Sequence, residues 1–507
     1  MNGIALASAM ILVAAILPAA DVVTYEEFGA VGDGRTDDQQ AIVQAHAAAN
    51  ARGLPVRAGD GRTYCIGKGA ATAEIRTDVD FGTAKFVIDD VGCERRTASI
   101  FRVAPDRPPF SVRGLSVLKR GQTELGVKLP GACLVHVENR GRRQYIRYGA
   151  NQNNGSPQQE VLLVDADGRI DPRAPVVWSF DAVTSATAYP VDERPLVIRG
   201  GVFTTIANQC ESRYDYHARN ILVERSNVRI EGLRHEVTGE LDHGAPYGGF
   251  VSVARCANIL VTNCVFTAHR MYATIGSAGV KVNMGSYDLT ANKAVNVSYV
   301  HCRQTTDILD TRYWGLFGSN YCKNLLYDDC RFSRFDAHMG VANATVRNSV
   351  MGHMGMNAIG FGTFLVENTK VYGRSLFNLR SDYGSTWEGE FVVRNCTFVP
   401  GRGAKAVGNL VGGSYDGQHD FGYACHMPRR IVVDGLRIED ANHPADYDGP
   451  FIFGEFNRKN TSADYVEKFP YHLTEEVVLK NVSTASGKEL RTSPNAWMFR
   501  DVRVVRQ

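Results

Sequence analysis

"NLLYDDCRF" (Asn324–Phe332) and "NATVRNSVM" (Asn343–Met351) are neighbouring copies of one unit, Asn-apolar-x-apolar-x-Asn-Cys-x-apolar, and they start 19 residues apart. "TFLVENTKV" starts a further 20 residues on, at Thr363. In each copy, alternating apolar residues end at a turn rich in Asn, which predicts one short β-strand. Helical repeats need longer segments with a period of 3.6, and the sequence lacks them. The repeat therefore favours a solenoid built from strands.

Other copies of the unit extend across the second half of the chain at irregular separations. They begin at Asn258, Asn296 and Glu390, with weaker copies at Pro195, Asn227, Arg430 and Glu476. Units of this length, each with one strand and turns, stack as the coils of a right-handed parallel β-helix. The sequence therefore predicts an all-β chain, a right-handed parallel β-helix solenoid with regular coils over residues 195–485.

Two positions of the unit repeat the same residue type from coil to coil. The seventh position holds Cys264, Cys302, Cys330 and Cys396, and the sixth holds Asn263, Asn348, Asn368 and Asn395. A free Cys packs as a small hydrophobic residue, and stacked amides can bond to one another along a column. We therefore expect these Cys to be buried and reduced, with Cys302 and Cys330 as the test cases. The odd total of 11 Cys leaves at least one thiol unpaired in any case.

The N-terminal region carries a second indication of the fold. "FGAVGDGRTDDQQAI" (Phe28–Ile42) precedes a helical pattern that ends at Gly53. It resembles the opening of the pectate-lyase-like superfamily (the pectin lyase fold), which includes polygalacturonases and phage tailspikes. The resemblance implies a capping strand and helix within residues 21–53, with Asp33, Asp37 and Asp38 in turns and at the helix N-cap.

The remaining boundaries follow from these two patterns. Residues 54–190 are expected to hold early turns with loop insertions, one of them around "RYGANQNNGSPQQE". Residues 21–507 are predicted to form a single β-helix domain. Residues 1–20, "MNGIALASAMILVAAILPAA", predict a signal peptide and hence a secreted or periplasmic protein, although no Lys or Arg stands near the start. A membrane-anchored or unanchored N-terminal helix is the alternative.

The charge balance excludes some partners. The chain has 56 basic and 54 acidic residues, so its net charge creates no field that would gather nucleic acid or membrane lipid. After the first twenty residues, no apolar run is long enough to cross a bilayer. We therefore expect neither nucleic acid nor a membrane as a partner.

Polar residues follow the predicted strands at equivalent places on successive coils. They are His269 and Arg270, Asp307 and Asp310, the group Arg334, Asp336 and His338, then His353, and finally Arg380 and Asp382. Stacked strands lie about 4.8 Å apart, so these side chains should form a strip. Arg312, Trp314 and Tyr383 lie in the same turns, in "DTRYWG" and "SDYGSTW". Aromatic faces beside polar groups are typical of a carbohydrate cleft, whereas the alternative is an ordinary solvated turn region.

The strip also resembles, in part, the catalytic motif of polygalacturonases, which runs Asn-Thr-Asp, Asp-Asp, Gly-His-Gly and Arg-x-Lys on consecutive turns. "RFDAH" aligns with the Asp pair, which implies a catalytic Asp336 but has Ala337 in place of its partner. "GHMG" implies His353, and "LRSD" implies Arg380 with Asp382 replacing the Lys. The resemblance covers the fold fully and the catalytic motif only partly, so it leaves the reaction open.

Three functions remain in play. The leading hypothesis is a polysaccharide-degrading glycoside hydrolase, in which Asp336 works with Asp307 or Asp310 as acid and base. A polysaccharide lyase is the second hypothesis: Arg334 or Arg380 would neutralise a uronate while a His or Tyr383 takes the proton. The third is a tailspike-like protein that binds a glycan without cleaving it.

The candidate residues fall into two groups. The predicted catalytic residues are Asp336, His353, His338, Asp307 and Asp310. The predicted substrate-binding residues are Arg334, Arg380, Asp382, Tyr383, His269, Arg270, Arg312 and Trp314. No cofactor is predicted, and no Asp/Glu cluster is regular enough to predict a metal site. The expected partner is a polysaccharide or oligosaccharide, and the sequence allows a homo-oligomer.

Overall fold

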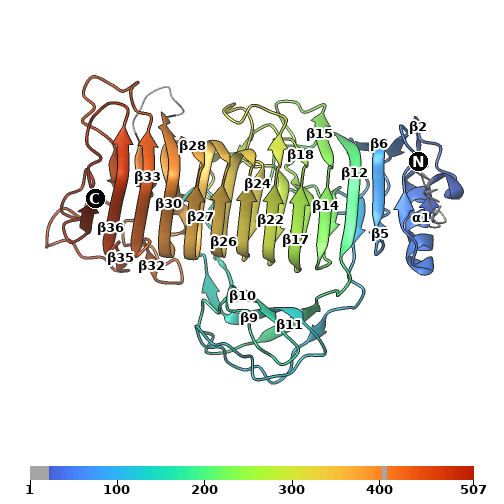
Figure 1. Cartoon of the computed structure of the whole chain (residues 1–507), viewed down its shortest axis with the longest axis horizontal. Helices are drawn as coiled ribbons and strands as arrows, with labels where there is room; N and C mark the ends of the chain where they lie inside the picture. Colours follow the sequence, from blue (N-terminus) through green and yellow to red (C-terminus); the bar gives the residue numbers. More distant parts are fainter. Residues whose placement is uncertain (1–21, 402–407) are drawn as a thin grey trace, which may run out of the picture.

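A computed structural model describes residues 22–401 and 408–507; the predicted signal peptide lies outside the described residues. Parallel strands stack along one axis from α1 at the N-terminal end to β36 at the other (Figure 1). This arrangement confirms the predicted right-handed parallel β-helix. In the described part of the chain, no helix is long and apolar enough to cross a membrane.

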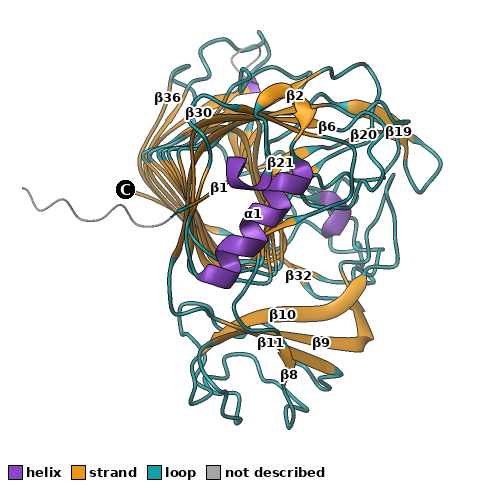
Figure 2. Ribbon diagram, turned by 90° about the vertical axis from the view of Figure 1, so that its right-hand side faces the viewer, coloured by secondary structure: helices purple, strands orange, loops and turns teal. Residues whose placement is uncertain are grey.

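The N-terminal cap is formed as the sequence predicts. It consists of β1 (Val23–Thr24), η1 (Glu26–Phe28), β2 (Asp33–Asp37) and α1 (Gln39–Arg52). Viewed along the solenoid axis, α1 lies across the end of the stack (Figure 2). Asp38 stands at the N-cap position, and its carboxylate accepts the Val31 N–H at 2.7 Å, while Asp33 accepts the N–H groups of Arg35 and Thr36. These carboxylates hold turns together.

Within the described residues, 23 strands, β1 and β2 included, form one large sheet. The other members are β3 (Val56–Arg57), β4 (Thr63–Ile66), β6 (Val79–Asp89), β12 (Leu196–Ile206), β14 (Val228–Glu231), β15 (Arg234–Thr238), β17 (Ala257–Thr262), β18 (Val265–Phe266), β22 (Val295–Val300), β23 (Arg303–Gln304), β25 (Lys323–Asp328), β26 (Arg331–Arg347), β27 (Val350–Glu367), β28 (Lys370–Gly373), β29 (Ser375–Leu379), β30 (Trp387–Pro400), β31 (Asn409–Gly412), β33 (Arg430–Ile438), β34 (Phe451–Phe453), β36 (Glu476–Thr484) and β37 (Arg503–Arg506).

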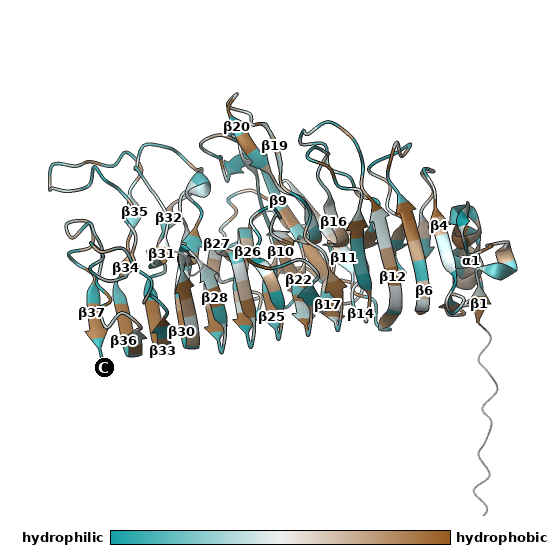
Figure 3. Cartoon of the chain, turned by 90° about the horizontal axis from the view of Figure 1, so that it is seen from above, coloured by the Kyte–Doolittle hydropathy of each residue, from teal (hydrophilic) through white to brown (hydrophobic). Residues whose placement is uncertain are grey.

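A second, six-stranded parallel sheet is formed by β5 (Ala73–Ile75), β7 (Phe101–Val103), β13 (Ile221–Val223), β16 (Gly248–Ala254), β21 (Tyr287–Asn292) and β24 (Phe317–Asn320). Two smaller pairs are β19 (Tyr272–Ile275) with β20 (Lys281–Met284), and β32 (Cys425–His426) with β35 (Tyr471–His472). Hydrophobic and hydrophilic bands alternate along the stacked strands (Figure 3). The β19–β20 hairpin projects from this stack.

Asparagines at the start and end of each unit adopt the left-handed backbone conformation that the sharp turns require. Asn258, Asn296, Asn324 and Asn343 have φ of 62°, 59°, 58° and 60°. Asn tolerates this region better than most residues. Their side-chain amides also bond from coil to coil, for example Asn296 Nδ2 to Asn258 Oδ1 at 2.8 Å and Asn324 Nδ2 to Asn296 Oδ1 at 2.8 Å. This ladder supplements the backbone bonds of the stack.

The Cys column is buried inside the solenoid, as predicted. Cys302 and Cys330 are 1% and 2% exposed, and all 11 Cys are free thiols. Each of the two thiols lies within hydrogen-bonding distance of a carbonyl of the preceding coil, Cys302 Sγ to Val261 O at 3.5 Å and Cys330 Sγ to Tyr299 O at 3.3 Å. The column therefore fills the core and links successive coils.

The predicted insertion within residues 54–190 is a compact unit of its own. The strands β8 (Phe110–Ser111), β9 (Cys133–Gln144), β10 (Ser156–Val164) and β11 (Ser185–Pro190) form a four-stranded antiparallel sheet beside the solenoid (Figures 1 and 2). It has a separate hydrophobic core. A buried ion pair, Lys323 Nζ to Glu160 Oε1 at 2.5 Å, attaches it to β25. This ion pair holds β10 against the solenoid.

Candidate functional site

A cleft of about 640 Å³ opens on the outer face of the second sheet and of the adjoining parts of β26, β27 and β29, which belong to the large sheet. Its floor is formed by the outward side chains of β21, β24, β26, β27 and β29, and its walls by the β9–β10 loop, the loop after β12 and the β19–β20 hairpin. The charged and aromatic residues that line it are Arg147, Tyr214, Tyr216, Tyr287, Trp314, Arg334, Asp336, His338, Arg380 and Tyr383. The volume is in the range of pockets that bind small ligands or sugars.

The short spacing of the units places three of these residues on one strand. Because the units at Asn324 and Asn343 leave no room for a loop, β26 continues unbroken from one face of the solenoid to the next. Phe335 and Ala337 are fully buried in the core. Side chains alternate along a strand, so Arg334, Asp336 and His338 face the cleft. Successive coils place Asn357 and then Asn378 in register with Asp336.

Arg334 is held at the base of the cleft by a carboxylate and two aromatic rings. Its Nη2 lies 2.9 Å from Asp336 Oδ1, and both side chains are almost completely buried. The guanidinium carbon lies 5.4 Å from the Trp314 ring centroid and 5.9 Å from that of Tyr287. Among the described residues, its Nε and Nη1 have no hydrogen-bond partner. Buried donors without partners are costly, so a ligand that accepts from Arg334 would stabilise this arrangement.

Two glycines make the approach of these side chains possible. A Cβ on Gly315 would lie 2.2 Å from Cδ of Arg334, and a Cβ on Gly285 would lie 2.2 Å from Nε1 of Trp314. Neither position can therefore carry a larger residue without displacing the side chain beside it.

His338 is a neutral imidazole with one free nitrogen. Asn320 donates through Nδ2 to Asn292 Oδ1, so its Oδ1 is the acceptor that lies 2.7 Å from His338 Nδ1. Nδ1 therefore carries the proton, and Nε2 keeps its lone pair. Nε2 has no partner within the described residues. Burial, and after it the charges of Arg380, Arg334 and Arg147, hold the pKa of His338 well below its usual 6.5.

Arg147, Arg380 and Asp382 form an ion-pair bridge around Tyr383. Arg147 Nε donates to Asp382 Oδ2 at 2.8 Å, and Arg380 Nη2 donates to the same oxygen at 2.6 Å. Both guanidinium carbons lie 5.3 Å from the Tyr383 ring centroid. Burial raises the pKa of the Tyr383 phenol, and the two arginines offset part of that shift. The phenol is thus protonated near neutral pH.

Solved structures with the same architecture exist at low sequence identity. The tailspike of Pseudomonas phage LKA1 matches with a TM-score of 0.55 at 13% identity, over 94% of this chain and 83% of that one. The tailspike of Pseudomonas phage phi297 matches with a TM-score of 0.51 at 13% identity, over 93% and 82%. The chain is a right-handed parallel β-helix. The β-helical tailspike of Acinetobacter baumannii bacteriophage AP22 was solved with a capsular saccharide. It matches with a TM-score of 0.50 at 10% identity, over 95% of this chain and 79% of that one. No protein-family model and no curated protein matches the sequence.

The β-helix brings together about half of the residues predicted for the strip. Trp314, Arg334, Asp336, His338, Arg380 and Tyr383 all line the cleft. Asp382 lies directly beside it and lines an adjoining pocket. The sequence predicted this grouping because successive coils stack in register.

The other predicted residues in the strip region lie outside the lining of the cleft. Asp307 accepts the Leu309 N–H, and Asp310 accepts the Arg312 N–H and ion-pairs with its guanidinium, so all three organise their own turn. In the β26–β27 pairing, Phe332 is opposite Met351 and Arg334 is opposite Gly355, so residues 352–354 form a bulge. His353 lies in that bulge, with its N–H bonded to Ile308 O and its Nε2 3.1 Å from Tyr313 O. The bulge removes His353 from the position opposite Arg334.

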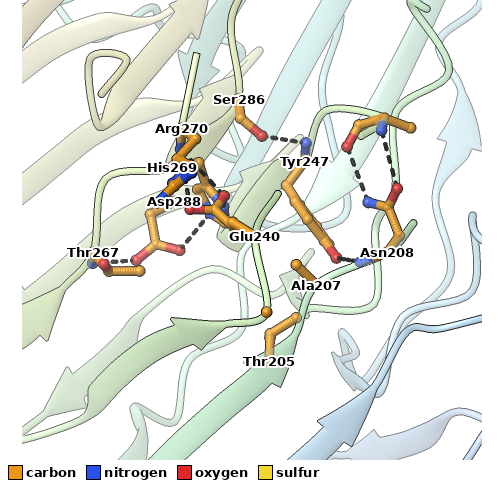
Figure 4. A network of polar contacts seen from close by, with 12 residues as sticks. Thr205, Ala207, Asn208, Glu240, Tyr247, Thr267, His269, Arg270, Ser286 and Asp288 are labelled. Atoms are coloured by element: carbon orange, nitrogen blue, oxygen red, sulfur yellow. Dashed lines mark hydrogen bonds and ion pairs between the residues drawn. The ribbon is translucent and has the colours of Figure 1, made fainter. Parts of the chain in front are cut away.

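His269 and Arg270 belong to a separate, buried polar network (Figure 4). His269 Nδ1 lies 3.1 Å from Glu240 Oε1, and its Nε2 lies 3.4 Å from Asp288 Oδ1. The Arg270 N–H donates to the Glu240 carboxylate. Asp288 also receives His235 Nδ1 at 2.6 Å and the Thr267 N–H at 2.8 Å. The network joins loops of neighbouring coils and contributes no lining residue to the cleft.

Several cleft residues could not be identified from the repeat. Arg147 comes from the β9–β10 loop, and Tyr214 and Tyr216 come from the loop after β12, both outside any unit. The Asn-rich composition of "RYGANQNNGSPQQE" indicated a loop but not its position in space. Among the described residues, no group of three or more His, Cys, Asp or Glu is arranged to hold a metal ion.

Proposed function

We propose that this protein is a polysaccharide lyase that cleaves a uronate-containing glycan by β-elimination in this cleft. One observation carries the proposal. Three guanidiniums, those of Arg147, Arg334 and Arg380, surround a neutral imidazole, His338, and Asp336 is the only carboxylate among the described residues that line the cleft. Such a site favours an anionic sugar, and it offers a neutral imidazole rather than a carboxylate as the general base.

The reaction would begin at the carbon that bears the uronate carboxylate. An arginine neutralises that carboxylate, which makes the proton on this same ring carbon more acidic. Arg334 is the best donor, since its Nε and Nη1 lack partners. His338 accepts the proton on Nε2, the electron pair forms the ring C=C bond, and the glycosidic oxygen at the next carbon leaves with its bonding electrons. The Tyr383 phenol would protonate that oxygen.

A glycoside hydrolase, which the sequence ranked first, has weaker support. Inverting or retaining hydrolysis needs two carboxyl groups, one of them protonated. Asp336 supports this alternative by its place in the cleft, and Asp382 is the nearest candidate for a partner. Burial raises the pKa of Asp382, but Arg380 and Arg147 outweigh burial and lower it, so this residue is a poor proton donor.

The structural neighbours add support for a glycan as the ligand. A β-helical tailspike of comparable extent was solved with a bacterial capsular saccharide. We propose a related acidic bacterial polysaccharide as the substrate class, and export on the basis of the apolar first twenty residues. A tailspike-like protein that binds the glycan without cleaving it is the remaining alternative.

The test is incubation with a panel of uronate-containing and neutral polysaccharides. A lyase produces an unsaturated uronate, which absorbs in the ultraviolet, together with new reducing ends. His338→Gln should abolish both signals, and His301→Gln, on an exposed histidine that pairs with Asp329 away from the cleft, should preserve them. New reducing ends without the ultraviolet signal would overturn the proposal in favour of hydrolysis. Binding without either signal would favour the non-catalytic alternative.

A further inference from the structure

A second pocket adjoins the cleft and differs from it in charge. Its volume is about 430 Å³, and Arg147 and Asn151 line both pockets, so the two share a wall at the Arg147–Asp382 ion pair. Its remaining side chains include Tyr148, Asp382, Tyr415, Asp416, His419 and Phe421. The cleft thus has three guanidiniums and one carboxylate, whereas the second pocket has one guanidinium and two carboxylates.

Hydrogen bonds between the insertion and the solenoid fix the walls of the second pocket. The β9–β10 loop that forms one side is fixed by two backbone bonds, Tyr148 N–H to Asp382 O at 3.0 Å and Ile146 N–H to Phe421 O at 3.1 Å. His419 Nε2 lies 3.0 Å from Ile146 O, which orients its ring. The insertion and the solenoid therefore define the pocket jointly.

The aromatic side chains of this pocket offer a stacking surface. Tyr148 is 54% exposed, and its ring centroid lies 5.0 Å from that of His419. The ring of Phe421 lies 4.5 Å beyond His419, and Tyr415 is buried behind it, with its ring 6.1 Å from that of Phe421. Pockets that bind small ligands are commonly lined by aromatic side chains of this kind. The C–H faces of a sugar ring match such a surface.

The charges determine which sugar fits. In this pocket Asp382 balances the charge of Arg147, whereas the cleft also holds Arg334 and Arg380. Asp416 is exposed, and its Oδ1 is oriented by the Gln418 N–H at 3.0 Å. Carboxylates only accept hydrogen bonds, so they bind hydroxyl groups and repel a uronate. A uronate would therefore be favoured in the cleft and disfavoured in the second pocket.

We infer that the second pocket is a subsite for an uncharged, hydroxyl-rich sugar adjacent to the reacting uronate. The substrate is then a mixed glycan of acidic and neutral residues rather than a pure polyuronate. This inference rests on the proposed function for the identity of the cleft as the uronate site. The two pockets together would select a glycan that contains both acidic and neutral sugars.

The test uses two defined oligosaccharides of equal length, an oligouronate and one that alternates uronate with neutral hexose. Binding is measured by calorimetry to the His338→Gln variant, so that no cleavage is needed for a result. The mixed oligosaccharide should bind at least several-fold more tightly. Tyr148→Ala should weaken its binding by roughly 2- to 10-fold, the scale of one aromatic contact, and Tyr148→Phe should retain it. The oligouronate should respond little to either change.

Reversing the charge of Asp416 in the second pocket provides an independent test. Asp416→Lys should improve the binding of the oligouronate and weaken that of the mixed oligosaccharide. Equal binding of the two oligosaccharides, or an equal response of both to Tyr148→Ala and Asp416→Lys, would overturn the subsite. If the selectivity is found but the wild type yields no unsaturated product from any glycan, the lyase proposal fails and the subsite stands. If the wild type yields an unsaturated product but does not distinguish the two oligosaccharides, the lyase proposal stands and the subsite fails.

Discussion

Two histidines of this protein, His338 in the cleft and His269 in the buried network, belong to the same solenoid but differ in protonation state: His338 is neutral near neutral pH and His269 is protonated. Burial disfavours the protonated form of both. Around His338 the neighbouring charges are guanidiniums, which lower its pKa further. Around His269 they are the carboxylates of Asp288 and Glu240, which outweigh burial and raise its pKa to about 9. The sign of the surrounding charge therefore decides the protonation state of each.

The two sites also differ in whether their hydrogen-bonding capacity is used. Asp288 accepts from His235 Nδ1 and the Thr267 N–H, so both of its oxygens are engaged, and it also ion-pairs with His269 Nε2 at 3.4 Å. In the cleft, His338 Nε2 and two nitrogens of Arg334 lack partners among the described residues. Polar groups that bond to one another hold loops in place, whereas buried donors and acceptors without partners can form hydrogen bonds with a ligand. We therefore expect changes in the cleft to affect activity and changes in the network to affect stability.

The largest effect is expected from His338→Gln. Loss of a general base lowers kcat by roughly 10²- to 10⁴-fold, while the free energy of unfolding should stay close to that of the wild type because Gln can retain the contact with Asn320. Kinetics of unsaturated-product formation and denaturant unfolding of the same preparation check both parts. A variant that keeps full turnover would place the base elsewhere, with Tyr383 as the next candidate.

The second largest effect is expected from Asp288→Asn, and it should appear in stability. Removing one charge of a buried pair typically lowers the free energy of unfolding by about 3–5 kcal/mol, and His269 would then keep only Glu240 as its counter-charge. Urea unfolding monitored by circular dichroism measures this. Asp242→Asn is the matched control, because Asp242 is 97% exposed and pairs only with the neighbouring His243. An unchanged midpoint for Asp288→Asn would contradict the structural role of the network.

A pH dependence of stability should follow from His269. Its pKa is raised from 6.5 to about 9 in the folded protein, so the folded state binds the proton more tightly than the unfolded state. The stabilisation is therefore complete below pH 6.5 and is lost as the pH rises through about 9. A shift of this size corresponds to roughly 3 kcal/mol. Unfolding curves across that range should show the loss in the wild type and a flatter profile in His269→Gln.

The smallest effect concerns the pH profile of activity. Because the pKa of His338 is held well below 6.5 by burial and then by Arg380, Arg334 and Arg147, the acid limb of kcat/KM should lie below that pH. Arg380→Gln removes one of the positive charges, so the limb should move upward by about one pH unit or less. Arg312→Gln, on an exposed arginine that does not line the cleft, is the control. An acid limb that Arg380→Gln leaves unmoved would mean that another group controls it.

Much of the fold could be predicted from the sequence because a β-helix repeats its local rules. Asn324 and Asn343 mark the turns, and Cys302 and Cys330 mark the core. The same repetition located part of the cleft. Arg334, Asp336 and His338 alternate on one strand, and Arg380 follows the strand two coils further on. Because paired strands keep a fixed register, a residue at a given position of one coil lies beside the residue at the same position of the next coil.

The sequence by itself determined the stacking direction, the core columns and the coil to which Arg334, Asp336 and His338 belong. Only the tertiary structure decided the rest of the site. A bulge at residues 352–354 displaced His353 from the position opposite Arg334, which a pattern of alternating residues does not reveal. Arg147 reached the cleft from an insertion that obeys no repeat. The charge states of His338 and His269 were set by neighbours distant in sequence, because electrostatic interactions depend on separation in space and on burial rather than on residue type.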